Sequence, residues 1–137
     1  MSRERIGKAH YAREDDVAKT LAEELETRDE VIFAVIFGSL LKGKGFHDID
    51  VGLYVDKKVV GDIVESSAYA EEVSGKLTRK VEAPVDVVVL NYTPMWLVRR
   101  ALKGIVLVDK DPILRAALWL ASIDNIYIAS TGRLQKS

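Results

Sequence analysis

The sequence contains no cysteine, and this absence excludes several kinds of site. Without cysteine the chain has no disulfide scaffold, no thiolate zinc site and no cysteine nucleophile. Imidazole is almost as scarce, because His10 and His47 are the two histidines of the chain. A histidine-rich metal site and the paired-histidine helix of a metalloprotease are therefore excluded as well.

An excess of positive charge and a long apolar run are also missing. Twenty Lys and Arg stand against 21 Asp and Glu, for a net charge of −1. Dedicated nucleic-acid binders normally carry a basic excess. The charged beginning of the chain is unlike a signal peptide, and no apolar run approaches the length of a membrane span. We expect a cytoplasmic protein that uses neither a membrane nor a nucleic acid as its partner.

The length and composition predict one globular domain over residues 1–137. The chain is 48% hydrophobic and 30% charged, which is the balance of a protein with a single packed core. Residues 1–14 and 130–137 are polar, and we expect them to be flexible tails.

Apolar periodicity predicts alternating helices and strands. We expect a short helical turn followed by a loop over 40–47, where two glycines and two lysines occur. The other predicted helices span residues 17–26, 62–80, 94–103 and 113 into the 120s, and the predicted strands span 31–37, 48–55, 85–90 and 105–108. This order indicates an α/β (α+β) fold in which helices flank a small mixed sheet of about four strands.

Asp48 and Asp50 open the second predicted strand and are the first candidates for chemistry. Residues i and i+2 of a strand point to the same face. At about 6 Å and an effective dielectric constant near 20, two carboxylates repel by roughly 3 kcal/mol. A divalent cation between them would offset this repulsion, and carboxylate oxygens favour Mg²⁺ or Mn²⁺. Asp86, an unexpected acid within a run of valines, could complete a two-ion site.

The chain contains its own control for this motif. Asp109 and Asp111 show the same spacing but come directly before Pro112. We interpret them as turn and helix-start residues. An Asp-x-Asp pair alone is therefore weak evidence for a metal site.

Gly38 and Ser39 follow the first predicted strand and have two interpretations. They are typical of a sharp turn and a helix N-cap. They are also typical of a phosphate-binding loop, in which glycine lets the backbone approach anionic oxygens. Lys42 and Lys44 are either solvated lysines or the charges that neutralise a triphosphate, and His47 is interpreted as a loop residue.

Taken together, these residues resemble the nucleotidyltransferase superfamily to which DNA polymerase β belongs. The resemblance rests on Gly38-Ser39, Gly43 and Asp48-Ile-Asp50, followed by Asp86, and it covers residues 31–118. It is closest to the minimal nucleotidyltransferases, or MNT domains, which often act as antitoxin partners of HEPN-domain toxins. Two features differ from the family pattern: the segment between the Gly-Ser and Asp-x-Asp motifs is shorter than in many members, and His47 stands where Ser is common.

The resemblance implies a Mg²⁺-dependent transfer of a nucleoside monophosphate, AMP from ATP, onto a hydroxyl of a partner protein. It implies that two Mg²⁺ ions are held, both by Asp48 and Asp50 and the catalytic one also by Asp86, which helps to activate the acceptor hydroxyl. It also implies that ATP is bound by Gly38, Ser39, Lys42 and Gly43. The implied partner is a HEPN-domain protein.

Two alternatives to this activity stay open at this point. One is an antitoxin that acts by contact and keeps an inactive site. The other is an enzyme that modifies a small molecule, as aminoglycoside-modifying relatives do. Met95, Trp96 and Trp119 are candidate interface anchors, although core positions are the favoured interpretation. The sequence also leaves homo-oligomerisation open.

Overall fold

A computed structural model describes residues 16–38 and 49–130. A helix over residues 16–26 leads into the first strand. The elements that follow are β1 (Val31–Phe37), β2 (Ile49–Val55), α2 (Ile63–Val81), β3 (Val85–Val89), the 3₁₀ turn η2 (Leu90–Tyr92), α3 (Met95–Leu102), β4 (Ile105–Asp109) and α4 (Pro112–Ser130). The predicted helical turn over 40–47 and the predicted tail over 1–14 lie outside the described residues. Ser130, placed in the other tail by the sequence, is the last residue of α4.

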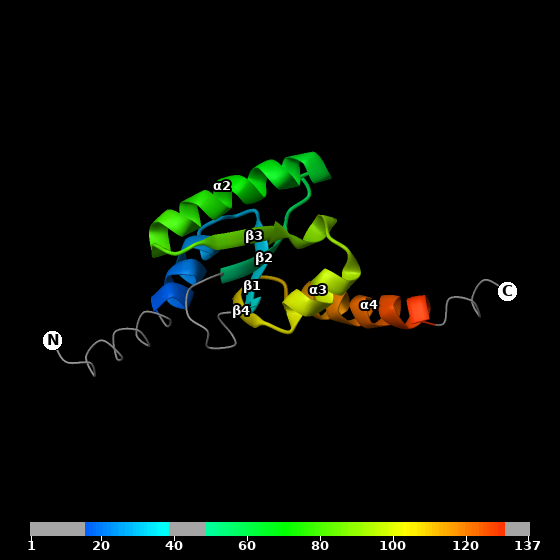
Figure 1. Ribbon diagram of the computed structural model, residues 1–137. Helices are drawn as coiled ribbons and strands as arrows, with labels where there is room; N and C mark the ends of the chain where they lie inside the picture. Colours follow the sequence, from blue (N-terminus) through cyan, green and yellow to red (C-terminus); the bar gives the residue numbers. More distant parts are fainter. Residues whose placement is uncertain (1–15, 39–48, 131–137) are drawn as a thin grey trace, which may run out of the picture.

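The four strands form one sheet in the order β3-β2-β1-β4 (Figure 1). β1 lies in the middle and pairs antiparallel with both β2 and β4. β2 and β3 pair in parallel, because α2 connects them as a crossover helix. The predicted mixed sheet of about four strands is therefore confirmed.

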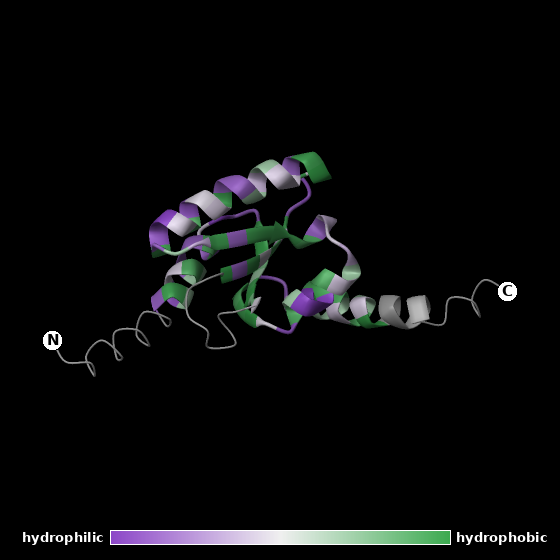
Figure 2. Cartoon of the chain, viewed as in Figure 1, coloured by the Kyte–Doolittle hydropathy of each residue, from purple (hydrophilic) through white to green (hydrophobic). Residues whose placement is uncertain are grey.

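The sheet is apolar on both faces, since helices cover each of them. On β1, Ala34 and Ile36 point into a cluster with the helix over 16–26 and with α2. Phe33 and Val35 point the other way, into a second cluster with α3. Figure 2 shows the resulting dominance of hydrophobic residues in the central strands. This burial on both faces explains why β1 is a continuous apolar run.

The outer edge of β3 is covered by side chains of α2. The backbone N–H of Val85 donates to Thr78 Oγ1 and that of Val87 donates to Ser74 Oγ, each at 3.0 Å. The two hydroxyls are four residues apart and lie on one side of the helix. They satisfy backbone donors that an edge strand would otherwise expose.

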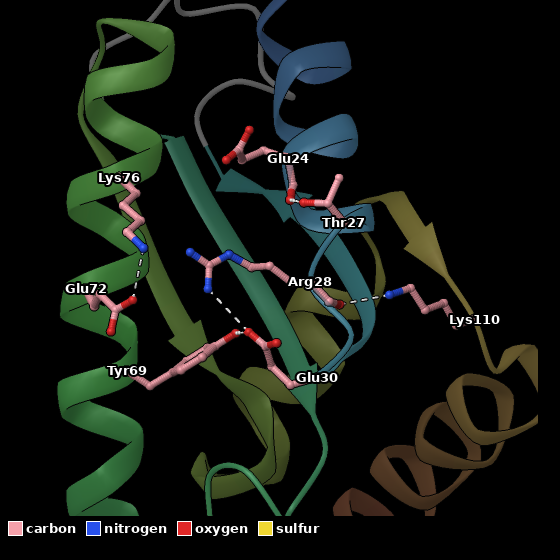
Figure 3. A network of polar contacts seen from close by, with 8 residues as sticks. All are labelled: Glu24, Thr27, Arg28, Glu30, Tyr69, Glu72, Lys76 and Lys110. Atoms are coloured by element: carbon pink, nitrogen blue, oxygen red, sulfur yellow. Dashed lines mark hydrogen bonds and ion pairs between the residues drawn. The ribbon is translucent and has the colours of Figure 1, made fainter.

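A polar network fastens the beginning of β1 to α2 (Figure 3). The Tyr69 hydroxyl donates to Glu30 Oε2 at 2.6 Å, and Arg28 Nη1 lies 3.3 Å from the same oxygen. Lys110 Nζ donates to the Arg28 carbonyl at 2.9 Å. Burial alone would raise the pKa of Glu30, but hydrogen bonds from the Tyr69 hydroxyl, from the backbone of Glu30 itself and from Arg28 outweigh it and hold the pKa below its ordinary value.

No helix within residues 16–38 and 49–130 is long and apolar enough to cross a membrane.

Candidate functional site

Asp50 and Asp86 are register partners in the parallel pairing of β2 with β3. Adjacent strands lie about 4.8 Å apart, so paired residues of this kind stand side by side on one face. Their neighbours Ile49, Val51 and Val85 are buried in the cluster beneath α2. The two carboxylates therefore belong to the opposite face of the sheet, where Asp50 is half-buried and Asp86 is exposed.

Gly38 contributes the third described part of this site. It directly follows β1, whose last residue, Phe37, pairs with Asp50. Its φ of 86° lies in a region that L side chains rarely adopt. A Cβ added at Gly38 would overlap Asp50 Oδ2. The end of β1 thus places bare backbone directly against one of the two carboxylates.

The apolar cover of this face stops short of the acids. Both Cδ atoms of Leu90, in η2, lie over Gly52, at 3.1 and 3.3 Å from where its Cβ would be. Gly52 is two residues beyond Asp50 on the same face of β2. The packed cluster under η2 and α3 therefore ends at Gly52. The next side chain of β2 on this face, that of Asp50, is polar and partly open to solvent.

The remaining predicted site residues lie outside the described residues. These are Ser39, Lys42, Gly43 and Asp48. The structure thus brings together three of the seven candidates, Gly38, Asp50 and Asp86. Within the described part of the chain, no group of three or more acidic or histidine side chains is placed to hold a metal ion.

The chemistry of the two described acids fits a hard divalent cation. Two carboxylates in register on an accessible face supply oxygen donors and concentrate negative charge. The repulsion between them falls when a cation binds.

The control pair, Asp109 and Asp111, has the structural role predicted from the sequence. Asp109 Oδ2 accepts from Arg115 Nε at 3.0 Å and from Arg115 Nη2 at 2.8 Å. Asp111 Oδ1 accepts from the backbone N–H of Leu114 at 3.0 Å and caps the beginning of α4. One oxygen of each carboxylate therefore binds local structure, and that prediction is confirmed.

The favoured core interpretation is wrong for one of the three candidate anchors. Trp96 is 60% exposed at the start of α3. Met95 is half-buried against the second cluster. Trp119 is half-buried, and the Arg99 guanidinium lies 5.8 Å from its ring centroid. The apolar spacing along α3 does not identify Trp96 as an exposed residue, because the helix has only eight residues and packs along one side.

Solved structures share this fold at low sequence identity. A chain of the toxin–antitoxin MntA–HepT aligns with 91% of this chain and 93% of its own length, at TM-score 0.62 and 17% identity. A toxin–antitoxin structure with AMP-PNP covers 89% and 93%, at TM-score 0.65 and 18% identity. A structure of the tri-AMPylated Shewanella oneidensis HEPN toxin in complex with MNT antitoxin covers 92% and 93%, at TM-score 0.62 and 16% identity.

A search of curated protein sequences gives no significant match. The sequence model described as "Polymerase beta, Nucleotidyltransferase" matches residues 19–113. This match begins in the first helix, includes the whole sheet and ends at the start of α4, so it contains Gly38, Asp50 and Asp86. Because it spans more than half of the sequence, the chain belongs to the polymerase beta nucleotidyltransferase family.

Proposed function

We propose that this chain is a Mg²⁺-dependent nucleotidyltransferase that moves AMP from ATP onto a hydroxyl of a HEPN-domain toxin, for which it is the antitoxin. The observation that carries the proposal is the pairing of Asp50 with Asp86, with Gly38 against Asp50, in a member of this family. Similar folds in toxin–antitoxin structures, one with a tri-AMPylated toxin and one with AMP-PNP, support the choice of AMP and of the partner.

The proposed reaction is an in-line displacement at the α-phosphorus of ATP. The acceptor hydroxyl oxygen forms the new P–O bond while the bond from the α-phosphorus to the bridging oxygen breaks. Pyrophosphate leaves with that electron pair. The hydroxyl proton passes to the Asp86 carboxylate and from there to water, since Asp86 is exposed. Positioning and charge neutralisation supply most of the acceleration in displacements of this kind.

The metal ligands in this proposal are Asp50 and Asp86, joined by Asp48. Bound Mg²⁺ would neutralise the phosphate oxygens and orient the attacking and leaving groups. The protein's contribution is to hold Asp50 and Asp86 side by side, which the backbone hydrogen bonds of the parallel pair β2–β3 achieve.

The phosphate-binding residues in this proposal are Gly38, Ser39, Lys42 and Gly43. Gly38 is suited to this role because it lacks a side chain at the point of closest approach to Asp50. A phosphate can therefore reach the backbone and the metal-binding carboxylate together.

ATP binding tests the proposal first. We expect calorimetry to show Mg²⁺-dependent ATP binding by the wild-type chain and loss of that binding in the double variant Asp48→Asn/Asp50→Asn. With a co-purified HEPN-domain protein and radiolabelled ATP, we expect AMP transfer that Asp50→Asn and Asp86→Asn each reduce at least 100-fold.

One outcome would replace the proposal with the contact-only alternative. A wild-type chain that neutralises its toxin without binding ATP, even in the complex, would be an antitoxin that acts by contact. Wild-type transfer rates in Asp50→Asn would reject the assignment of the metal ligands while leaving the antitoxin role intact.

A further inference from the structure

The two described acids of the candidate site differ in how firmly the sheet holds them. Asp50 lies on β2, which has a neighbouring strand on each side, whereas Asp86 lies on β3, an edge strand with β2 as its one neighbour. Ladder hydrogen bonds can therefore hold the backbone around Asp50 from two directions, but that around Asp86 from one. The Asp86 side chain is exposed, so packing around it does little to fix its place. The position of its carboxylate thus depends on what holds the outer edge of β3.

Two hydroxyls of α2 hold this outer edge, and Figure 1 shows the helix running along the strand. Thr78 Oγ1 accepts from the backbone N–H of Val85, and Ser74 Oγ accepts from that of Val87, each at 3.0 Å. The N–H of Val87 belongs to the peptide bond that joins Asp86 to Val87. The two hydroxyls therefore hold the strand immediately before and immediately after Asp86.

The spacing of the hydroxyls matches the strand at these two positions and then stops. Four helical residues advance about 6 Å, and two strand residues advance about 6.6 Å. Because α2 and β3 run in opposite directions, the next repeat sets Ala70 against Val89, and both residues line one hollow beside β3. Alanine has no hydroxyl, although cover of the whole strand edge would require a third one here. The hydroxyls are thus confined to the residues that flank Asp86.

We propose that Ser74 and Thr78 are positioning residues for Asp86. They hold β3 on the side that has no neighbouring strand, so that the Asp86 carboxylate stays beside that of Asp50, its register partner. This inference rests on the proposed function, in which Asp86 binds the catalytic Mg²⁺ and accepts the proton of the acceptor hydroxyl. Without the two hydroxyls the carboxylate can shift, and a shift of about 1 Å at a reacting site can lower a rate roughly 100-fold.

Amide hydrogen exchange measured by NMR tests the two hydrogen bonds directly. Thr78→Val keeps the branched shape of the side chain and removes its hydroxyl, whereas Thr78→Ser keeps the hydroxyl and removes a methyl group. We expect the Val85 amide to exchange about fivefold faster in Thr78→Val and within about twofold of the wild-type rate in Thr78→Ser. Ser74→Ala should speed the exchange of the Val87 amide in the same way. If the shape of the side chain mattered instead of its hydroxyl, the two Thr78 variants would show the reverse order.

Metal binding by the full chain tests the consequence for Asp86 separately from catalysis. Mn²⁺ can be titrated in the presence of ATP and followed by electron paramagnetic resonance. The ion held by Asp86 is the one that Asp86→Asn removes or weakens. We expect Ser74→Ala and Thr78→Val each to weaken the binding of this ion about fivefold, and the double variant to weaken it about 20-fold. The other ion should keep its affinity within about twofold.

The matched control is Asn91→Ala, which removes two hydrogen bonds from a different part of the sheet. The Asn91 side chain accepts from the backbone N–H of Val55 at 2.9 Å and donates to the Val55 carbonyl at 2.8 Å. Val55 is the last residue of β2, at the other end of the strand from Asp50. Asn91→Ala should lower the resistance to urea as the α2 variants do, while both Mn²⁺ affinities stay within about twofold of the wild type.

The transfer assay adds a kinetic signature. We expect Thr78→Val to lower kcat about fivefold with the KM for ATP nearly unchanged, because the residues proposed to bind ATP lie elsewhere, and Thr78→Ser to keep the wild-type kcat.

The outcomes separate this inference from the proposed function. Unchanged binding of the Asp86-dependent ion in the double variant Ser74→Ala/Thr78→Val would overturn the inference and leave the proposed function intact. An equal loss of that ion in Asn91→Ala would do the same, since any weakening of the sheet would then suffice. A wild-type chain that binds no Mn²⁺ in the presence of ATP would overturn the proposed function and this inference with it.

Discussion

The backbone of Gly38 lies directly against the carboxylate of Asp50. A Cβ at residue 38 would overlap Asp50 Oδ2, and the φ of 86° at Gly38 is itself unfavourable for any other residue. One glycine therefore allows β1 to end beside the carboxylate that pairs with Asp86. This contact connects the two motifs that first suggested a nucleotide site.

The substitution Gly38→Ala should damage catalysis more than folding. The methyl group must displace the Asp50 carboxylate, and a shift of about 1 Å at a reacting site can lower a rate roughly 100-fold. The positive φ adds a stability loss of about 1–2 kcal/mol. We expect AMP transfer to fall at least tenfold while the chain stays folded, as measured by a transfer assay together with urea denaturation.

The control for this variant is Gly75→Ala on α2. A Cβ there would lie 3.4 Å from Arg79 Nη1, which is an ordinary contact with a flexible side chain. Alanine favours a helix over glycine by about 1 kcal/mol. Gly75→Ala should therefore keep wild-type transfer and gain stability. Equal transfer rates in Gly38→Ala and Gly75→Ala would show that the Gly38–Asp50 contact has no catalytic importance.

The substitution Asp109→Asn should separate the two Asp-x-Asp pairs. Asp109 binds Arg115 through two hydrogen bonds, on the far edge strand from Asp86. Removing its charge weakens this pair and should cost about 1 kcal/mol of unfolding free energy. Transfer activity should stay within twofold of the wild type. A loss of activity similar to that of Asp50→Asn would mean that the wrong aspartate pair has been assigned to the site.

The order of the elements could be predicted from the sequence because each strand is apolar on both faces or is bounded by clear turns. The run from Val31 to Phe37 is buried along nearly its whole length and coincides with β1. In the structure β3 ends at Val89, one residue before the end of the strand predicted over 85–90. The reason is that Leu90 begins η2 and packs over Gly52. Leu90 and Gly52 are far apart in the sequence, so the residues around Leu90 give no sign of this contact.

The site could be predicted only in part, because its residues come from three strands. The sequence places Asp48 and Asp50 on one strand, but it cannot give the register that sets Asp50 beside Asp86. The closeness of Gly38 to Asp50 depends on the same register. The exposed apolar side chains of α4 could not be predicted for a different reason. A run of Ile, Leu and Ala predicts burial, and only the structure shows that Ile113 and Leu120 are exposed.

The substitution Gly104→Ala should destabilise the fold. Gly104 links α3 to β4, and a Cβ there would overlap the Ile36 carbonyl oxygen and crowd Phe37 Cβ at 3.0 Å. Neither backbone nor Cβ can rotate away, so the strands must separate slightly. We expect a loss of roughly 1–3 kcal/mol in unfolding free energy by urea denaturation. A loss smaller than 0.5 kcal/mol, roughly the range of neutral surface substitutions, would show that the connection adapts easily.

The Glu30–Tyr69 hydrogen bond should make stability depend on acid pH. In the folded chain the pKa of Glu30 lies below its ordinary value of 4.5, because hydrogen bonds from Tyr69, from the backbone of Glu30 and from Arg28 overcome the effect of burial. The folded state therefore binds this proton more weakly than the unfolded state does. The resulting stabilisation is complete above the unfolded pKa and disappears as the pH falls through the folded pKa.

The substitution Glu30→Gln should show this dependence directly. We expect it to lose about 1–3 kcal/mol at pH 7, since hydrogen bonds to a charged group are lost, and to approach wild-type stability near pH 3. The matched control is Glu72→Gln, because Glu72 forms an exposed ion pair with Lys76 at 3.3 Å on the surface of α2. It should change stability by less than about 0.5 kcal/mol at either pH. Thermal denaturation at pH 3 and pH 7 distinguishes the two variants. A deficit of Glu30→Gln that is equally large at both pH values would mean that Glu30 stabilises the fold through its shape rather than its charge.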